Sequence, residues 1–265
     1  PRVTEIHGGS TVNIVPLESD AWVEGLALET ILEHCARESK KTGVQFGAVE
    51  EGGLIHIHAL GESAHAASPE GGKNAQTALL ALLASLPLAP SAGQKAICDL
   101  SRLFPYGDNH GTALGVDQED AISGRLTLVF SKLTFTKTGF EGQYDSRCPI
   151  CATNDNMRAV SEKNLNACGF TFRKKPDMYA PHHTSAESDL CQTLLRTYED
   201  YTGQKGECVA IGGGTYVHDI EGGVAFGCAM PGTDNRMHGA DEFAVIDELM
   251  VSAKMFTQVI LDLCK

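Results

Sequence analysis

Hydrophobic residues recur at helical spacing from residue 26 to residue 41, where Leu28, Ile31 and Cys35 fall on one face. Gly43 follows this segment, and glycine is the residue that most often ends a helix. The pattern therefore predicts an amphipathic helix over residues 26–41. The same spacing predicts further helices over residues 74–86, 91–104, 154–168, 185–201 and 246–263.

Apolar and polar residues alternate in two neighbouring segments, 44–50 and 54–60, which are separated by Glu51, Gly52 and Gly53. Two alternating segments joined by a short glycine turn are typical of a β-hairpin. Alternation or β-branched content also predicts strands over residues 3–8, 11–24, 125–138, 140–147 and 170–173, and a short buried strand over residues 207–211.

The predicted elements divide the chain into two parts. A unit of two strands, a helix and a strand is used twice before residue 180, which predicts an α+β domain with antiparallel sheets backed by helices. The composition shifts to Pro, Lys, His and Thr over residues 174–184, and this shift marks a boundary. We expect domains over residues 1–180 and 181–265. The second, at about 80 residues, is small for an independent core, so we interpret it as part of a larger α/β domain.

Net charge limits the choice of partner. The chain of 265 residues has a formal net charge of −13 and a pI near 5.1. Nucleic-acid binding generally needs a basic face, so we expect no nucleic-acid partner. Its longest apolar stretch, residues 78–88, is too short to cross a bilayer as a helix. No charged-then-apolar signal segment opens the sequence. We therefore expect a cytoplasmic protein with no membrane partner.

The nine cysteines are scattered through apolar contexts, and their odd number argues against a closed disulfide framework. Cys148 and Cys151 have the spacing of a redox or zinc pair. A zinc knuckle needs a second such pair, which the sequence lacks. We therefore interpret these two cysteines as structural.

Several polar residues stand where a predicted strand ends. His65 lies between a strand and a helix, where an imidazole can donate a hydrogen bond to an oxyanion, and Arg147 closes a strand, where it can bind a carboxylate through two hydrogen bonds. A capped turn and a surface ion pair are the common alternatives. His56 and His58 share one face of a predicted strand, and we expect a surface pair with no nearby carboxylate.

Two glycine-containing loops complete the set of candidates. Gly212, Gly213 and Gly214 precede Thr215, and exposed backbone N–H groups in such a run can bind an anion. His238 stands in a glycine-flanked loop before the last helix, and a neutral imidazole is a common metal ligand. A simple turn and a surface histidine are the alternatives.

The order of these motifs along the chain resembles the aminoacylase and carnosinase family of zinc peptidases, and within it the bacterial dipeptidase V type. The resemblance covers nearly the whole chain and begins with a glycine-led turn before Asn13. Its most specific motifs are Gly212 to Tyr216, Val224 to Gly227, and Pro231 to Phe243.

The resemblance implies a role for each matching residue. His238 would be a ligand to one of two zinc ions, and His65 would stabilise the tetrahedral transition state from a lid domain. Asn13 would face the substrate, and Arg147 would bind its C-terminal carboxylate. The same carboxylate would be held by Gly213, Gly214 and Thr215.

The resemblance also implies a zinc-dependent dipeptidase acting on dipeptides or short peptides, with a lid over residues 1–180 and part of the catalytic domain over residues 181–265. The family's other zinc ligands would precede the lid. We therefore expect this chain to be a fragment that is inactive alone, because a zinc site uses at least three protein ligands.

Two alternatives remain open: an amidohydrolase acting on N-acyl amino acids, and a noncatalytic lid or dimerisation module. A lid doubled within one chain can replace a partner's lid, so the parent protein is expected to be monomeric.

Overall fold

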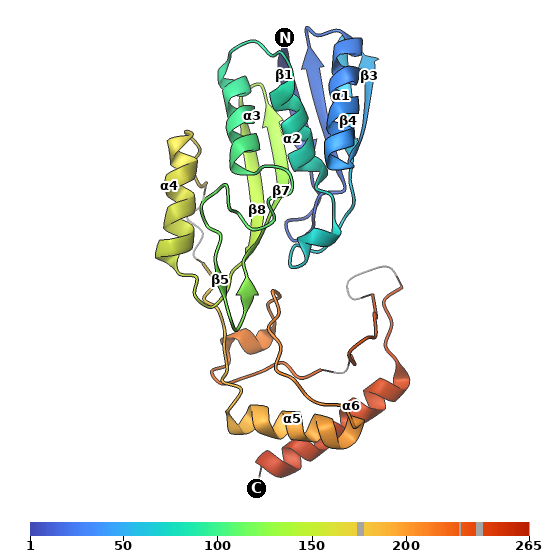
Figure 1. The fold of residues 1–265 in the computed structure, drawn as a ribbon, viewed down its shortest axis with the longest axis vertical. Coiled ribbons are helices and arrows are strands. Elements are labelled where there is room, and N and C mark those ends of the chain that lie inside the picture. Colours follow the sequence, from blue (N-terminus) through green and yellow to red (C-terminus); the bar gives the residue numbers. More distant parts are fainter. Residues whose placement is uncertain (174–177, 228, 237–240, 265) are drawn as a thin grey trace. The chain divides into compact units, whose positions relative to one another are not determined.

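The computed structural model describes residues 1–173, 178–227, 229–236 and 241–264. The chain divides into two compact units, Pro1–Ala180 and Pro181–Lys265. Figure 1 shows the strands gathered in the first unit and two long helices in the second.

The first unit is built on a six-stranded antiparallel sheet with the order β3-β4-β2-β1-β7-β8. The two central strands come from the first 24 residues, and the later hairpins flank them on either side. The strands are β1 (Arg2–Gly8), β2 (Glu18–Glu24), β3 (Gln45–Glu51), β4 (Leu54–Leu60), β7 (Thr127–Thr136) and β8 (Gly139–Arg147). A separate small hairpin pairs β5 (Glu119–Asp120) with β6 (Gly124–Arg125).

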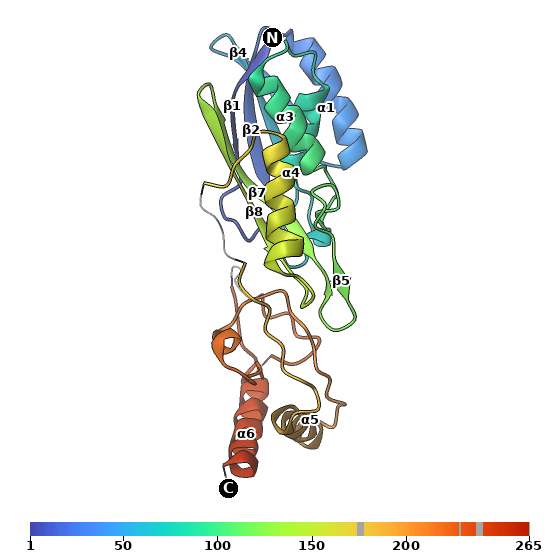
Figure 2. The same cartoon turned by 90° about the vertical axis from the view of Figure 1, so that its left-hand side faces the viewer.

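Three helices, α1 (Leu28–Thr42), α2 (Ala75–Ser85) and α3 (Ala92–Leu103), cover one face of this sheet (Figure 2). α2 is the most buried of the three, because nearly all its side chains are apolar and packed. The Asn74 side chain caps its start by accepting a hydrogen bond from Thr77 N–H. α4 (Ala159–Ala167) continues from a π-helical turn over Asn154–Arg158.

The opposite face of the sheet is polar and partly exposed. It carries Asp20 and Trp22 on β2 and His56 and His58 on β4. The residues between them point to the helices and are buried, as alternation in a strand requires.

Most of the elements predicted for this unit are confirmed. The helix over residues 26–41 is α1, and it ends at Gly43, whose φ of 72° is left-handed. The hairpin over residues 44–60 is also present. Two strand predictions are wrong: residues 11–17 form a loop before β2, and residues 170–173 lie outside any strand. Phe170 packs into the core instead, which explains its apolar character.

The second unit contains α5 (Asp189–Thr202), a short 3-10 helix η3 (Tyr216–Asp219) and α6 (Ile246–Leu263). Both long helices were predicted, and they pack on each other. The buried strand predicted over residues 207–211 is wrong. Val209 is 80% exposed and Ile211 is 64% exposed, because no described segment of this unit pairs with them.

Within the described ranges, no helix is both long and apolar enough to cross a membrane.

Candidate functional site

Asn13 and His65 lie side by side on two neighbouring loop segments at one end of the sheet. The carbonyl of Asn13 accepts a hydrogen bond of 2.9 Å from Ala66 N–H, and Val15 N–H donates one of 2.8 Å to the carbonyl of Ala64. Ile14 and His65 are paired in an isolated antiparallel bridge. The side chains of Asn13 and His65 are both exposed. The structure thus brings together two residues that are 52 positions apart in the sequence.

Close packing beneath these two segments fixes their position. Val15, Ala66 and Val129 form a small buried hydrophobic cluster, separate from the main core. The hydroxyl of Thr127 donates a hydrogen bond of 2.9 Å to the carbonyl of Ala66. The hydroxyl of Ser131 donates to the carbonyl of Val12. β7 therefore anchors both segments.

The N-terminal segment reaches this position through a glycine. Gly9 follows β1 and has a φ of 75°, which favours glycine. A Cβ atom at Gly9 would lie 1.8 Å from the carbonyl oxygen of Ser131. Only a residue without a side chain allows the loop that carries Asn13 to pass so close to β7.

A hydrogen bond sets the tautomer of His65. Its Nδ1 accepts a hydrogen bond of 3.1 Å from Ala67 N–H, so the proton of the neutral imidazole is on Nε2. The carbonyl of His65 accepts another hydrogen bond, of 2.9 Å, from Ser68 N–H, which closes a turn. His65 therefore presents its Nε2–H donor at the surface, and such a donor can stabilise an oxyanion.

Arg147 lies at the same end of the sheet and on the same face. It is the last residue of β8 and stands opposite Thr127 on β7. Side chains of directly paired residues share a sheet face, and the hydroxyl of Thr127 contacts the carbonyl of Ala66. The Arg147 side chain consequently projects from the face on which the His65 segment lies. Leu128, the next residue of β7, packs into the main core on the other face.

The guanidinium of Arg147 is oriented by a neighbouring carboxylate. Its Nε donates to Asp145 Oδ1 at 2.6 Å, and a terminal nitrogen donates to Asp145 Oδ2 at 2.9 Å. The two side chains are 24% and 15% exposed. A two-point pair of this kind holds the plane of the guanidinium in one orientation.

Cys148 follows Arg147 and is partly buried, whereas Cys151 is exposed. Burial raises the pKa of the Cys148 thiol. A raised pKa lowers the fraction of thiolate, the reactive form. This favours a structural role for Cys148, and the interpretation of the pair stays a prediction.

The remaining predicted residues belong to the second unit. Gly213, Gly214 and Thr215 are exposed, and Thr215 precedes η3, where its carbonyl accepts a hydrogen bond of 3.0 Å from His218 N–H. A Cβ atom at Gly213 or Gly214 would meet nothing within 4 Å. A lack of space for a side chain within this unit therefore does not explain why these two positions are glycine. His238 lies outside the described residues.

The described part of the chain contains no group of three or more His, Cys, Asp and Glu side chains that could hold a metal ion. The described residues by themselves therefore do not provide a complete zinc site.

The interpretation of His56 and His58 as a pair without a nearby carboxylate is wrong. His56 Nε2 lies 2.7 Å and His58 Nδ1 lies 2.9 Å from the same oxygen of Asp20. Trp22 stacks on His56 with ring centroids 4.7 Å apart and an angle of 9° between the planes. The sequence predicts the β3–β4 hairpin but not the β2–β4 pairing, and that pairing brings Asp20 beside the histidines.

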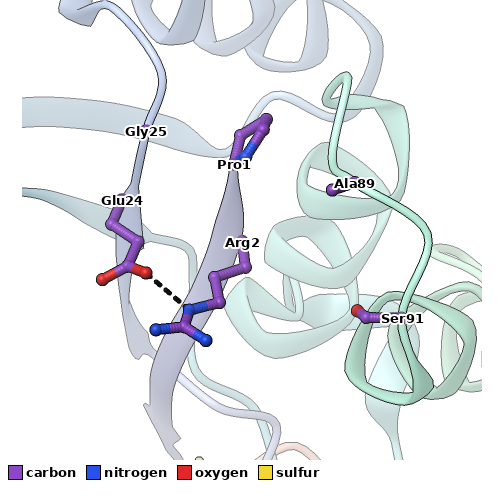
Figure 3. A pocket seen from close by; sticks show the side chains of 6 residues that line it. All are labelled: Pro1, Arg2, Glu24, Gly25, Ala89 and Ser91. Carbon is purple, nitrogen blue, oxygen red and sulfur yellow. Dashed lines mark hydrogen bonds and ion pairs between the residues drawn. The ribbon is translucent and has the colours of Figure 1, made fainter.

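A surface pocket lies near the N-terminus of the chain, lined by Pro1, Arg2, Glu24, Gly25, Ala89 and Ser91 (Figure 3). Arg2 and Glu24 form an ion pair across its edge. Arg2 begins β1, whereas the Asn13 loop follows the other end of that strand. The pocket is therefore separate from the predicted site residues.

Comparison with known proteins relates the chain to bacterial dipeptidases. It is 33% identical over 264 residues to a Bacillus subtilis protein named "Putative dipeptidase YtjP", a match that covers 99% of this chain and 56% of the relative. It is 30% identical over 267 residues to the Beta-Ala-Xaa dipeptidase of Lactobacillus delbrueckii subsp. lactis, covering 98% of this chain and 55% of the relative. No family model matches the chain.

The chain therefore spans a little over half the length of these curated relatives, and nearly all of it takes part in the matches. Both relatives carry the name of a dipeptidase. The expectation of a fragment stays a prediction.

Proposed function

We propose that this chain supplies the substrate-binding surface of a dipeptidase. The observation that carries the proposal is the arrangement in the first unit, where the segments that carry Asn13 and His65 pair with each other at the end of the sheet at which Arg147 closes β8. The relationship to proteins named as dipeptidases supports the choice of substrate.

In this proposal Arg147 binds the C-terminal carboxylate of the substrate. A guanidinium offers five N–H donors in a fixed plane, and Asp145 accepts from Nε and one terminal nitrogen. The substrate carboxylate would accept hydrogen bonds from N–H groups of this guanidinium. The family resemblance also implies substrate-binding roles for Gly213, Gly214 and Thr215, which offer backbone N–H groups and a hydroxyl.

His65 would act on the reacting carbonyl. When water adds to the peptide carbonyl, negative charge develops on its oxygen, and the Nε2–H of His65 can donate a hydrogen bond to it. Such a donor stabilises the transition state more than the substrate, so it raises the rate of the chemical step. Asn13, beside it, would bind a polar group of the peptide.

The attacking water must be activated by another group. The family resemblance assigns that task to two zinc ions, with His238 as one ligand, and metal ions lower the pKa of bound water. We propose that the other ligands lie outside this chain, which alone would then be inactive, and that the parent enzyme is cytoplasmic and monomeric.

A comparison of four substrates tests the proposal on a version of the chain extended upstream in its reading frame. The substrates are a dipeptide, its C-terminal amide, an N-acyl amino acid and a longer peptide. We expect rapid cleavage of the dipeptide and a much higher KM for the amide, because Arg147 loses its anionic partner.

Preferential cleavage of the N-acyl amino acid would instead support the amidohydrolase alternative. No hydrolysis of any of the four would support a noncatalytic module.

A further inference from the structure

Two cysteines of the second unit meet where the chain folds back along α5. Gly203 ends α5 in the left-handed conformation, with a φ of 69°. The chain then reverses, and residues 204–211 continue without regular secondary structure. Cys191, Leu195 and Glu199 are spaced four residues apart on α5, so they form one stripe along the helix.

The returning segment lies on this stripe. Gly206 N–H donates a hydrogen bond of 3.1 Å to Glu199 Oε1. A Cβ atom at Gly206 would lie 3.0 Å from Cδ2 of Leu195 and 3.2 Å from its carbonyl oxygen. The segment therefore packs closely against α5 at this level.

The next step along both segments brings two thiols together. From Gly206 to Cys208 the returning segment advances by two extended residues, or about 6.6 Å. From Leu195 back to Cys191 is four helical residues, or about 6 Å along α5. Cys208 then reaches the level of Cys191 on α5, and Cys191 is close enough to raise the pKa of the Cys208 thiol. Both thiols are free; Cys191 is buried and Cys208 is exposed.

We propose that Cys191 and Cys208 are a dithiol site that a low-molecular-weight disulfide oxidises to an intramolecular disulfide. Cys208, which is exposed, attacks a sulfur of the small disulfide and releases one thiol. The buried Cys191 then attacks the sulfur of Cys208 and releases the second. Two protein thiols lose two electrons, the small disulfide gains them, and the two protein protons end on the two released thiols.

The bond would tie the segment before Gly212 to α5, and the proposal is independent of any hydrolytic activity. Loss of hydration and the neighbouring Cys191 both raise the pKa of the Cys208 thiol. The attacking thiolate is therefore scarce at neutral pH, and oxidation should become faster as the pH rises.

The test is to map the disulfide in the full chain. The folded chain is treated with oxidised glutathione at about pH 8.5, where thiolate is more abundant. Remaining thiols are then alkylated, and the protein is cut with trypsin and with a protease specific for Glu, without reduction. We expect one main cross-linked species that joins residues 188–196 to residues 208–221.

Two variants test the order of the steps. In Cys191→Ser, Cys208 should accumulate as a mixed disulfide with glutathione, because the second attack cannot occur. In Cys208→Ser, Cys191 should stay reduced because it is buried. Cys98→Ser, in the first unit, is the matched control and should leave the cross-link unchanged.

A mixed disulfide between glutathione and the exposed Cys151 serves as the positive control, because it shows that oxidised glutathione has reacted with the chain. The proposal is overturned if Cys151 is modified while the two peptides are recovered alkylated and unlinked. A dominant cross-link of either peptide to another cysteine overturns it as well. Because the mapping uses the unaltered chain, this result stands even if a variant fails to fold.

Discussion

Arg147 is held in place by Asp145, two residues before it on the same strand, through hydrogen bonds of 2.6 Å and 2.9 Å. The pair uses one side of the guanidinium and fixes its plane. An arginine fixed in this way loses little side-chain freedom when an anion binds, so less of the binding free energy is spent on ordering it. The pair therefore suits Arg147 to bind a substrate carboxylate.

Replacing Arg147 with lysine should weaken binding of the substrate carboxylate. Lysine keeps the charge but cannot form two parallel hydrogen bonds, so we expect KM for a dipeptide to rise roughly 10- to 100-fold, the equivalent of one charged hydrogen bond. The rise should be much smaller for the dipeptide amide. Arg173→Lys is the control, because Arg173 is an exposed arginine paired with Glu141. Equal changes in both variants would contradict the role of Arg147.

Replacing His65 should lower kcat rather than raise KM, because its donor acts on charge that develops in the transition state. We expect His65→Phe to lose roughly 100- to 1000-fold in kcat, and His65→Gln to lose less because its amide can still donate. His7→Phe, at an exposed histidine that contacts Glu5, is the control. An unchanged kcat in His65→Phe would exclude this role.

Gly9→Ala should destabilise the first unit more than Gly52→Ala. Both glycines have a positive φ, but a Cβ atom would collide with Ser131 at Gly9 and meet nothing within 4 Å at Gly52. We expect a loss in the free energy of unfolding of roughly 2 to 5 kcal/mol for Gly9→Ala and roughly 1 to 2 kcal/mol for Gly52→Ala. Urea unfolding followed by fluorescence of Trp22, the single tryptophan, measures both. Equal losses would mean that the loop does not depend on this close approach.

The ion pair of Asp117 and Arg125 should make the fold sensitive to acid. The Arg125 guanidinium, with help from the Thr112 hydroxyl, lowers the pKa of Asp117 from 3.8 to about 2. A carboxyl with a lowered pKa in the folded state contributes stability above its unfolded pKa, and this contribution disappears as the pH falls through the folded pKa.

Arg125→Met should therefore have a lower free energy of unfolding than the unaltered chain at neutral pH. This difference in free energy should disappear as the pH falls from 4 to about 2, where Asp117 becomes protonated. Urea unfolding at several pH values measures this. Lys163→Met is the control, because it removes an exposed positive charge for which the described residues show no ion pair. A difference that stays constant with pH would contradict the assignment.

The sequence correctly predicts helices and hairpins that depend on residues close together in the chain. The helix ending at Gly43 and the hairpin around Gly52 depend on spacing and turn residues within a few positions. The strand predicted over residues 207–211 depends instead on pairing with another strand. Its apolar residues fit a buried strand, but no described segment of the second unit pairs with them, so they are exposed.

The sequence shows the residue types of the candidate site, which stays a prediction, but it does not show how these residues are arranged in space. Asn13, His65 and Arg147 stand out as polar residues beside predicted strands. Their placement at one end of the sheet depends on the bridge between Ile14 and His65 and on the pairing of β7 with β8. The Asp20 contact with His56 could not be predicted for a similar reason, since strand order in a sheet is not a local property.

The most direct test of the central claim measures zinc content and dipeptide hydrolysis for this chain and for a version extended upstream in its reading frame. We predict that the extended version binds about two zinc ions, as a binuclear site requires, and hydrolyses dipeptides, and that the 265-residue chain does neither. Zinc binding and hydrolysis by the 265-residue chain, or the absence of both from the extended version, would contradict the account.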